Sequence, residues 1–208
     1  MKSKGQGADA QLPAVSFGPR LAFRMFGRPR GALGRLGGRI MAHTNRDCGA
    51  WVAALLEIGA GHHVLEVGFG PGVVIAEVTR LATAGLVAGI DPSPEMVEQA
   101  RKRNAKAIES GQVELRCSSV ASLPFAEDSF DRALAINSFQ VWPDAAIGLR
   151  EIRRVMKPNA RIALGFTPHS GQPREGLTEA LAATGFAEPS LVEKGQDFCA
   201  LARKPGGR

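Results

Sequence analysis

The sequence predicts a doubly wound α/β domain, in which a mostly parallel seven-stranded sheet is covered by helices on both faces. From about residue 63, short apolar runs alternate with segments of helical periodicity, as expected for parallel strands joined by crossover helices. Runs such as ALAI and IALGF have the composition of strands buried on both faces. The chain has 208 residues and is 44% hydrophobic, which is enough for one full-sized core.

The predicted elements follow one another along residues 45–204. The first helix begins near Asn45 or Asp47, either of which can cap it, and Gly59-Ala60-Gly61 ends it. Pro94 can open a later helix, because proline is tolerated in a first turn. The strands are predicted at residues 63–68, 87–91, 113–119, 130–137, 161–166, 189–194 and 198–204, and the later helices at 72–82, 94–110, 144–157 and 174–186.

The connection between the last two strands predicts their direction. Only a few residues around Gly195-Gln196-Asp197 join them. A link this short permits a hairpin but no crossover helix, so the last strand is expected to be antiparallel.

Residues 1–44 are predicted to form a basic, partly disordered arm or lid in front of a domain at 45–208. Residues 1–41 carry eight basic residues and one acid, a net charge of +7, and the rest of the chain has a net charge of −1. Such an arm can attract an anionic membrane surface, nucleic acid or an acidic substrate. Its apolar residues, interleaved with arginines, can also cover an apolar acceptor. The alternatives are a solvated tail, or packing on the domain.

Composition also bears on location and redox chemistry. The sequence has no apolar stretch of eighteen or more residues and no secretory signal pattern. The three cysteines, Cys48, Cys117 and Cys199, are far apart and lack metal-ligand spacing. A cytoplasmic protein with reduced thiols and no metal site is therefore expected.

The segment Glu66-Val67-Gly68-Phe69-Gly70-Pro71-Gly72 leaves a predicted strand and enters a predicted helix. Glycines there allow a sharp turn and a close approach of a ligand to the backbone. The pattern is G-x-G-x-G, because Val73 stands where a dinucleotide fingerprint needs its third glycine. The acid before the loop disfavours pyrophosphate and suits a cationic ligand. By itself, however, such a loop is also typical of a plain tight turn.

Asp91 supplies the context. It ends the second predicted strand, 23 residues after Gly68, and a carboxylate there can accept hydrogen bonds from both hydroxyls of a ribose. The alternative is a helix-capping role before Pro92, Ser93 and Pro94. Because the loop and the acid follow adjacent strands, the pair favours a nucleoside ligand.

At this point the sequence resembles the class I S-adenosylmethionine-dependent methyltransferases, in particular the group with small-molecule and quinone-type enzymes. The matching segments are VLEVGFGPG (64–72), GIDPSPEM (89–96), SLPFAEDSFDRALAIN (122–137) and LREIRRVMKP (149–158). The resemblance implies a Rossmann-like methyltransferase fold and S-adenosylmethionine as the cofactor. It also implies methyl transfer to a small acceptor that is apolar or quinone-like.

The resemblance assigns roles to individual positions. Gly68, Gly70 and Gly72 would lie against the methionine part of the cofactor, and Asp91 would hold its ribose. Glu66 would lie beside the ammonium group of the cofactor or orient the loop. Pro92, Met96, Ser119 and Val120 would contact the adenine, and Asn137 would line the cofactor near the reacting methyl group. Ser119 replaces the acid that the family often has, so adenine recognition would either be weaker or rest on backbone groups.

Candidate catalytic groups are few. His43, before the first helix, and His169, after the fifth strand, are the candidate general bases, with a surface role as the alternative for each. The sequence after Asn137 lacks the Asn/Asp-Pro-Pro-aromatic motif of enzymes that methylate bases or amides, which makes nucleic acid a less favoured partner. Two other functions stay open: a nucleic-acid methyltransferase that uses the basic arm, and a non-catalytic cofactor-binding module. The oligomeric state is not predicted.

Overall fold

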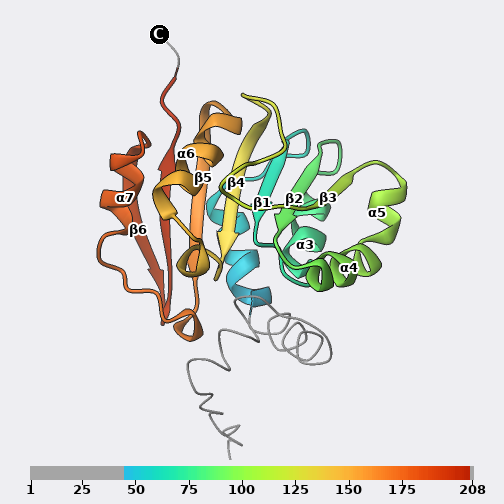
Figure 1. Cartoon of the computed structure of the whole chain (residues 1–208), viewed down its shortest axis with the longest axis horizontal. Helices are drawn as coiled ribbons and strands as arrows, with labels where there is room; N and C mark the ends of the chain where they lie inside the picture. Colours follow the sequence, from blue (N-terminus) through green and yellow to red (C-terminus); the bar gives the residue numbers. More distant parts are fainter. Residues whose placement is uncertain (1–44, 207–208) are drawn as a thin grey trace, which may run out of the picture.

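The computed structural model describes residues 45–206, and the predicted arm over residues 1–44 lies outside them. Its centre is a seven-stranded sheet with the strand order β3-β2-β1-β4-β5-β7-β6 (Figure 1). The strands are β1 (Val64–Val67), β2 (Val87–Asp91), β3 (Val113–Cys117), β4 (Phe130–Ile136), β5 (Met156–Phe166), β6 (Ala187–Lys194) and β7 (Asp197–Arg203).

Strand directions agree with the sequence prediction. β1 pairs in parallel with β2 and β4, and β2–β3 and β4–β5 are parallel as well. β7 runs antiparallel to both of its neighbours, β5 and β6. The carboxyl ends of the parallel strands therefore meet at one edge, the lower edge in Figure 1. This arrangement confirms a doubly wound, mostly parallel sheet with an antiparallel last strand.

Helices cover both faces and divide the core in two. One cluster packs α6 and α7 on the sheet, through side chains such as Ile152 and Leu181. The other packs a helix over residues 45–55, α3 and α4 on the opposite face, through Val52, Val78 and Val97. The labelled helices are α3 (Val73–Leu81), α4 (Pro94–Arg103), α5 (Ala105–Glu109), α6 (Ala145–Val155) and α7 (Leu177–Ala183), with short 3-10 turns η2 (Phe139–Val141) and η3 (Pro168–Ser170).

The alternation of side chains in β1 decides which face each residue serves. Leu65 and Val67 belong to the cluster under α6 and α7, whereas Val64 belongs to the cluster under α3. Because side chains in a strand alternate between faces, Glu66 shares the face of Val64. This places its carboxyl group under the helix over residues 45–55 and α3.

Among the boundaries that differ from the prediction, two have a clear structural cause. The helix expected over residues 94–110 is divided at Asn104, whose side-chain amide donates to the carbonyls of Gly72 (3.0 Å) and Ala100 (2.9 Å). The helix expected to reach residue 157 ends at Val155, and β5 begins at Met156 rather than residue 161. Met156 pairs with Phe130 of β4 across an irregularity in register, so tertiary pairing overrides the local helical pattern.

Candidate functional site

The glycine loop connects β1 to α3 at the carboxyl edge of the sheet. Gly68, Gly70 and Gly72 have φ angles of 76°, 52° and 74°, which L-residues with a Cβ adopt only under strain. A Cβ at Gly68 would lie 2.5 Å from the Cβ of Ser138. The Ser138 hydroxyl donates to the carbonyl of Val67 at 2.7 Å and so ties the loop to the end of β4. Glycine is required here by both conformation and space.

Asp91 is joined directly to this loop. It ends β2 and is 6% exposed. Its Oδ2 accepts a hydrogen bond from the Gly70 N–H at 2.9 Å, and its Oδ1 accepts one from the Ser93 N–H at 2.9 Å. The loop and the acid, expected from the sequence to share one site, are therefore in direct contact. Each carboxylate oxygen keeps acceptor capacity beyond the bond that it already makes.

The surroundings of Asp91 also set its charge. Burial raises the pKa of Asp91 to about 6, while the hydrogen bonds from the Ser93 and Gly70 backbone oppose the rise. The carboxyl group is therefore mostly ionised at pH 7 and mostly protonated below pH 6. An ionised acceptor fits the role of holding hydroxyl groups.

Glu66 lies one strand away from Asp91 and is more deeply buried. It is 2% exposed, and its Oε2 has no hydrogen-bond partner among the described residues. Burial, and then the neighbouring Asp91 carboxylate, raise the pKa of Glu66 well above its ordinary value. A buried carboxyl group with an unpaired oxygen is costly, which makes it a candidate for binding a cationic ligand.

Asn137 directly follows β4 and holds three elements together. Its Nδ2 donates to the Asn45 Oδ1 (2.8 Å) and the Thr167 Oγ1 (3.0 Å), and its Oδ1 accepts from the Thr167 N–H (2.9 Å). Its φ angle is 50°. Both amide protons are thus used within the described residues, and the side chain fixes the ends of β4 and β5 to the start of the first helix. This network could not be predicted from local sequence patterns, because its partners are 30 and 92 residues away.

The residues expected around the adenine differ in exposure. Pro92 and Ser119 are exposed, whereas Met96 and Val120 are 1% and 4% exposed. Pro92 is in the segment between β2 and α4, and Met96 is in the first turn of α4, where its N–H donates to the Ser93 hydroxyl. Both are close in sequence to Asp91. Val120 instead packs in the cluster under α6 and α7, so its contact with a ligand stays a prediction.

Of the two candidate bases, one lies within the described residues and the other does not. His169 is exposed on η3, directly after β5, at the same edge of the sheet as the glycine loop. His43 lies outside the described residues. Sequence reasoning gave no role to Ser138 or Thr167, which lock the loop and Asn137 in place. Hydroxyl residues directly after apolar strands are the only signal that points to them.

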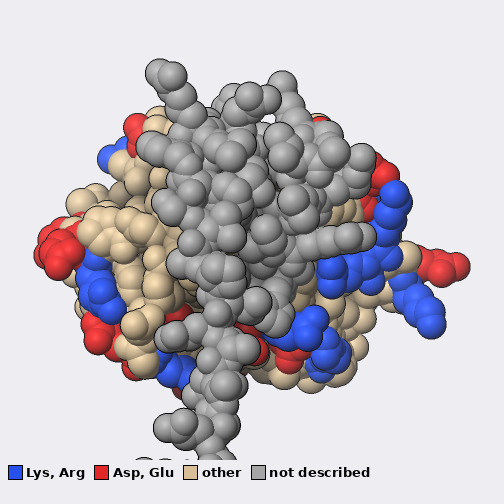
Figure 2. Space-filling view, turned by 90° about the horizontal axis from the view of Figure 1, so that it is seen from below, with Lys and Arg blue, Asp and Glu red and all other residues tan. Residues whose placement is uncertain are grey.

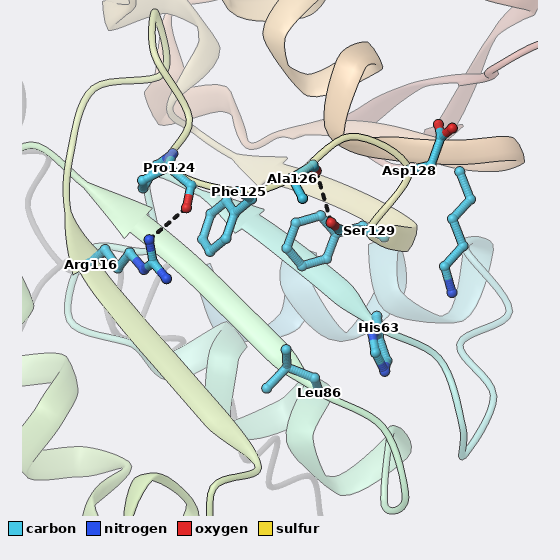
Figure 3. A pocket seen from close by; sticks show the side chains of 10 residues that line it. His63, Leu86, Arg116, Pro124, Phe125, Ala126, Asp128 and Ser129 are labelled. Atoms are coloured by element: carbon cyan, nitrogen blue, oxygen red, sulfur yellow. Dashed lines mark hydrogen bonds between the residues drawn. The ribbon is translucent and has the colours of Figure 1, made fainter.

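Two hollows lie at opposite edges of the sheet. One, of about 400 Å³, lies at the carboxyl edge and is lined by Pro168, the residue before His169. It is lined by Thr167, Pro168, Gln172, Arg174, Gly195, Gln196 and Phe198. The other, of about 460 Å³, includes His63 and Leu86, which directly precede β1 and β2 (Figure 3). It therefore lies at the amino ends of parallel strands, away from the glycine loop.

Three further properties of the described residues concern surface charge, metal binding and membrane spanning. In the described residues visible at the carboxyl edge, basic and acidic side chains are intermixed (Figure 2). Within residues 45–206, no group of three or more His, Cys, Asp or Glu side chains is arranged to hold a metal ion. No helix in this range is both long and apolar enough to cross a bilayer.

Comparisons with known proteins agree with this geometry. The family described as "Methyltransferase domain" matches residues 65–164, a range that contains the glycine loop, Asp91 and Asn137. The chain is 26% identical over 182 residues to the uncharacterized methyltransferase YdaC of Bacillus subtilis (strain 168), a match covering 82% of this chain and 98% of that protein.

Two further matches extend the comparison. The chain is 36% identical over 163 residues to the O-methyltransferase resE of Aspergillus sclerotiorum. That match covers 76% of this chain but 59% of the relative. Among solved structures, the fold is similar to that of a SAM-dependent methyltransferase from Aquifex aeolicus, with a TM-score of 0.72 at 22% identity. This match covers 80% of this chain and 96% of that one.

Proposed function

This chain belongs to the class I S-adenosylmethionine-dependent methyltransferases, and on that premise we propose that it methylates a small acceptor that is apolar or quinone-like. The direct contact between the Gly70 N–H and Asp91 carries the proposal, because it unites the loop and the acid in one nucleoside site at the carboxyl edge. When bound, the cofactor supplies a methyl group activated by a sulfonium centre.

The residues of the site fit this cofactor. The positive φ angles at Gly68, Gly70 and Gly72 allow the sharp turn in which the Gly70 N–H reaches Asp91. Asp91 has acceptor capacity left for ribose hydroxyls, and Pro92 and Met96 follow it toward the adenine. The unpaired Oε2 of Glu66 suits an ammonium group. Ser119, Val120 and Asn137 complete the proposed set.

The protein's contribution to the reaction is mainly positional. Holding a nucleophile in line with a methyl group can lower the barrier by up to about 7–11 kcal/mol. The Asn137 network serves this purpose by fixing the ends of β4 and β5 relative to one another. A rigid sheet edge would hold the cofactor and the acceptor in a fixed position relative to each other.

We place the acceptor near the 400 Å³ hollow beside η3. Phe198 supplies an apolar wall, and His169 is next to the lining residue Pro168. The relative resE is named as an O-methyltransferase, which favours a hydroxyl acceptor as the first class to test. His169 would then remove the hydroxyl proton, a contribution of about 10²–10⁴-fold in rate. His43 remains the second candidate base.

The test is a transfer assay with isotopically labelled S-adenosylmethionine and a panel of phenols, quinols and aliphatic alcohols. We expect label in at least one extractable product, and loss of that product in Asp91→Asn. The matched control is Asp128→Asn, because Asp128 lines the hollow at the opposite edge. Equal activity of the two variants, or no labelled product from any class, would contradict the proposal.

The arm over residues 1–44 is proposed as a lid that also contacts anionic membranes. Removing residues 1–41 takes away a net charge of +7, so the truncated chain should no longer sediment with vesicles that contain an anionic phospholipid. The nucleic-acid alternative predicts instead that RNA or DNA retention falls steeply with salt. This alternative rests on the basic arm, because the described residues visible around this edge carry charges of both signs (Figure 2).

A further inference from the structure

The buried Glu66 carboxyl group presents an electrostatic problem that the site itself must solve. The register places Glu66 between Gly89 of β2 and Leu134 of β4. Because Gly89 has no side chain, Phe69 and Ile75 occupy the space over it. Glu66 therefore has apolar surroundings, with one of its oxygens unpaired.

No positive charge of the described residues compensates Glu66. Asp91, on the same face of the neighbouring strand, is the charged group that acts on it, and it is negative. None of the other ionisable groups on the packed helices is a cause of its titration behaviour. On the helix over residues 45–55 these are Arg46, Asp47, the Cys48 thiol and Glu57 just beyond it. On α3 they are Glu77 and Arg80, and on α4 they are Glu95, Glu98, Arg101, Lys102 and Arg103.

Two buried carboxylates on one face, with no cation beside them in residues 45–206, cannot both be ionised at low cost. Asp91 receives two backbone hydrogen bonds, which favour its ionised form. Glu66 has no comparable donor on Oε2. The proton is therefore assigned to Glu66.

We propose that Glu66 carries a proton before the cofactor binds and that the cationic cofactor displaces this proton into solvent. The O–H bond of the carboxyl group breaks, the proton passes to the buffer, and the cofactor's positive charge takes its place beside the carboxylate. The site thus exchanges one cation for another and stays close to neutral. This inference rests on the cofactor site and is independent of the acceptor's identity.

The sign of the resulting pH dependence is fixed. A group that is protonated in the free protein and ionised in the complex opposes binding at low pH. Cofactor affinity should therefore increase as the pH rises, by up to tenfold per pH unit for one displaced proton. The dependence should level off above the pKa of Glu66 in the free protein.

The experiment is calorimetric titration of the full chain with S-adenosylmethionine in phosphate and in imidazole buffer at pH 6.5 and 7.0. The difference in heat between two buffers of different ionisation enthalpy gives the number of protons released. This pH range keeps the cofactor's amino group protonated, since α-amino groups titrate near about 7.7–8.0. We expect net proton release by the wild type that falls in Glu66→Gln to the share of Asp91, whose pKa of about 6 leaves it partly protonated at these pH values.

Glu77→Gln on α3 is the matched control and should release protons as the wild type does, because Glu77 lies outside the cofactor site. Should Glu66→Gln fail to fold, infrared spectra of the wild type give the same information. The C=O stretch of a protonated carboxyl group should disappear when the cofactor is added.

Binding by the wild type without proton release, or undiminished release in Glu66→Gln, would overturn the inference. Proton-coupled cofactor binding combined with no transfer to any acceptor would defeat the proposed acceptor class and leave the role of Glu66 intact. No cofactor binding at all would defeat both.

Discussion

Substitution of Gly72 by alanine tests whether the loop geometry and its packing are as described. Gly72 has a φ angle of 74°, where an L-residue loses about 1–2 kcal/mol. A Cβ there would also lie 2.7 Å from the Cβ of Ala100, 2.9 Å from the Cα of Ala100 and 2.7 Å from the Asn104 Nδ2. Because one of these atoms is backbone of α4, the loop or the helix must move.

Gly111 provides a matched control. Its φ angle is 76°, and a Cβ there would meet no atom within 4 Å. Gly111→Ala therefore isolates the conformational cost of a positive φ angle. Because alanine also lowers the entropy of the unfolded chain, the net loss of stability should be about 1 kcal/mol. Gly72→Ala should add an overpacking cost of about 1–3 kcal/mol. The difference between the two variants measures the contact between the loop and α4.

Unfolding in urea, followed by circular dichroism, gives both free energies, and calorimetric titration gives cofactor affinity. We expect Gly72→Ala to bind S-adenosylmethionine about tenfold more weakly or worse, equivalent to about 1.4 kcal/mol, and Gly111→Ala to bind it normally. Equal destabilisation of the two variants would refute the reasoning, because the crowding at Gly72 would then have no energetic consequence.

Two further outcomes concern stability. Asn137→Ala loses three side-chain hydrogen bonds and should be destabilised by about 2–4 kcal/mol in urea unfolding. Asn159→Ala, at a position with a φ angle of 64°, should lower the free energy of unfolding clearly less. Equal destabilisation of the two variants would contradict the role of the Asn137 network. Partial burial raises the pKa of Asp131, but a backbone N–H and Lys157 outweigh it and lower that pKa. Asp131→Asn should therefore be less stable than wild type at pH 7, and this difference should shrink as the pH falls below about 4. A constant difference from pH 7 to pH 3 would rule out this linkage.

Local sequence patterns predicted most of the fold. The apolar runs at residues 63–68 and 87–91 became adjacent buried strands, and the short link at Gly195 produced the antiparallel hairpin. The boundary at Met156 was missed because its pairing with Phe130 is a tertiary interaction. The break at Asn104 was missed for the same reason, since its side chain bonds to Gly72, 32 residues away.

Part of the candidate site could also be predicted from the sequence. The proximity of the glycine loop and Asp91 was predictable, because the carboxyl ends of parallel strands lie at one edge of the sheet. The burial of Glu66 beside Asp91 depends on which face each strand residue takes, which the strand register determines. The hydrogen bonds of Asn137 form because the ends of β4 and β5 and the start of the first helix are close in space. No local sequence pattern predicts this proximity.

The hydrogen bond from Asn137 to Asn45 also determines where the preceding 44 residues are attached. Their attachment point is anchored to the ends of β4 and β5, beside the proposed reaction centre. A fluorophore or fused reporter inserted just before residue 45 would therefore be attached at the carboxyl edge of the sheet. Its emission offers a way to follow ligand arrival in real time, without any label on the ligand.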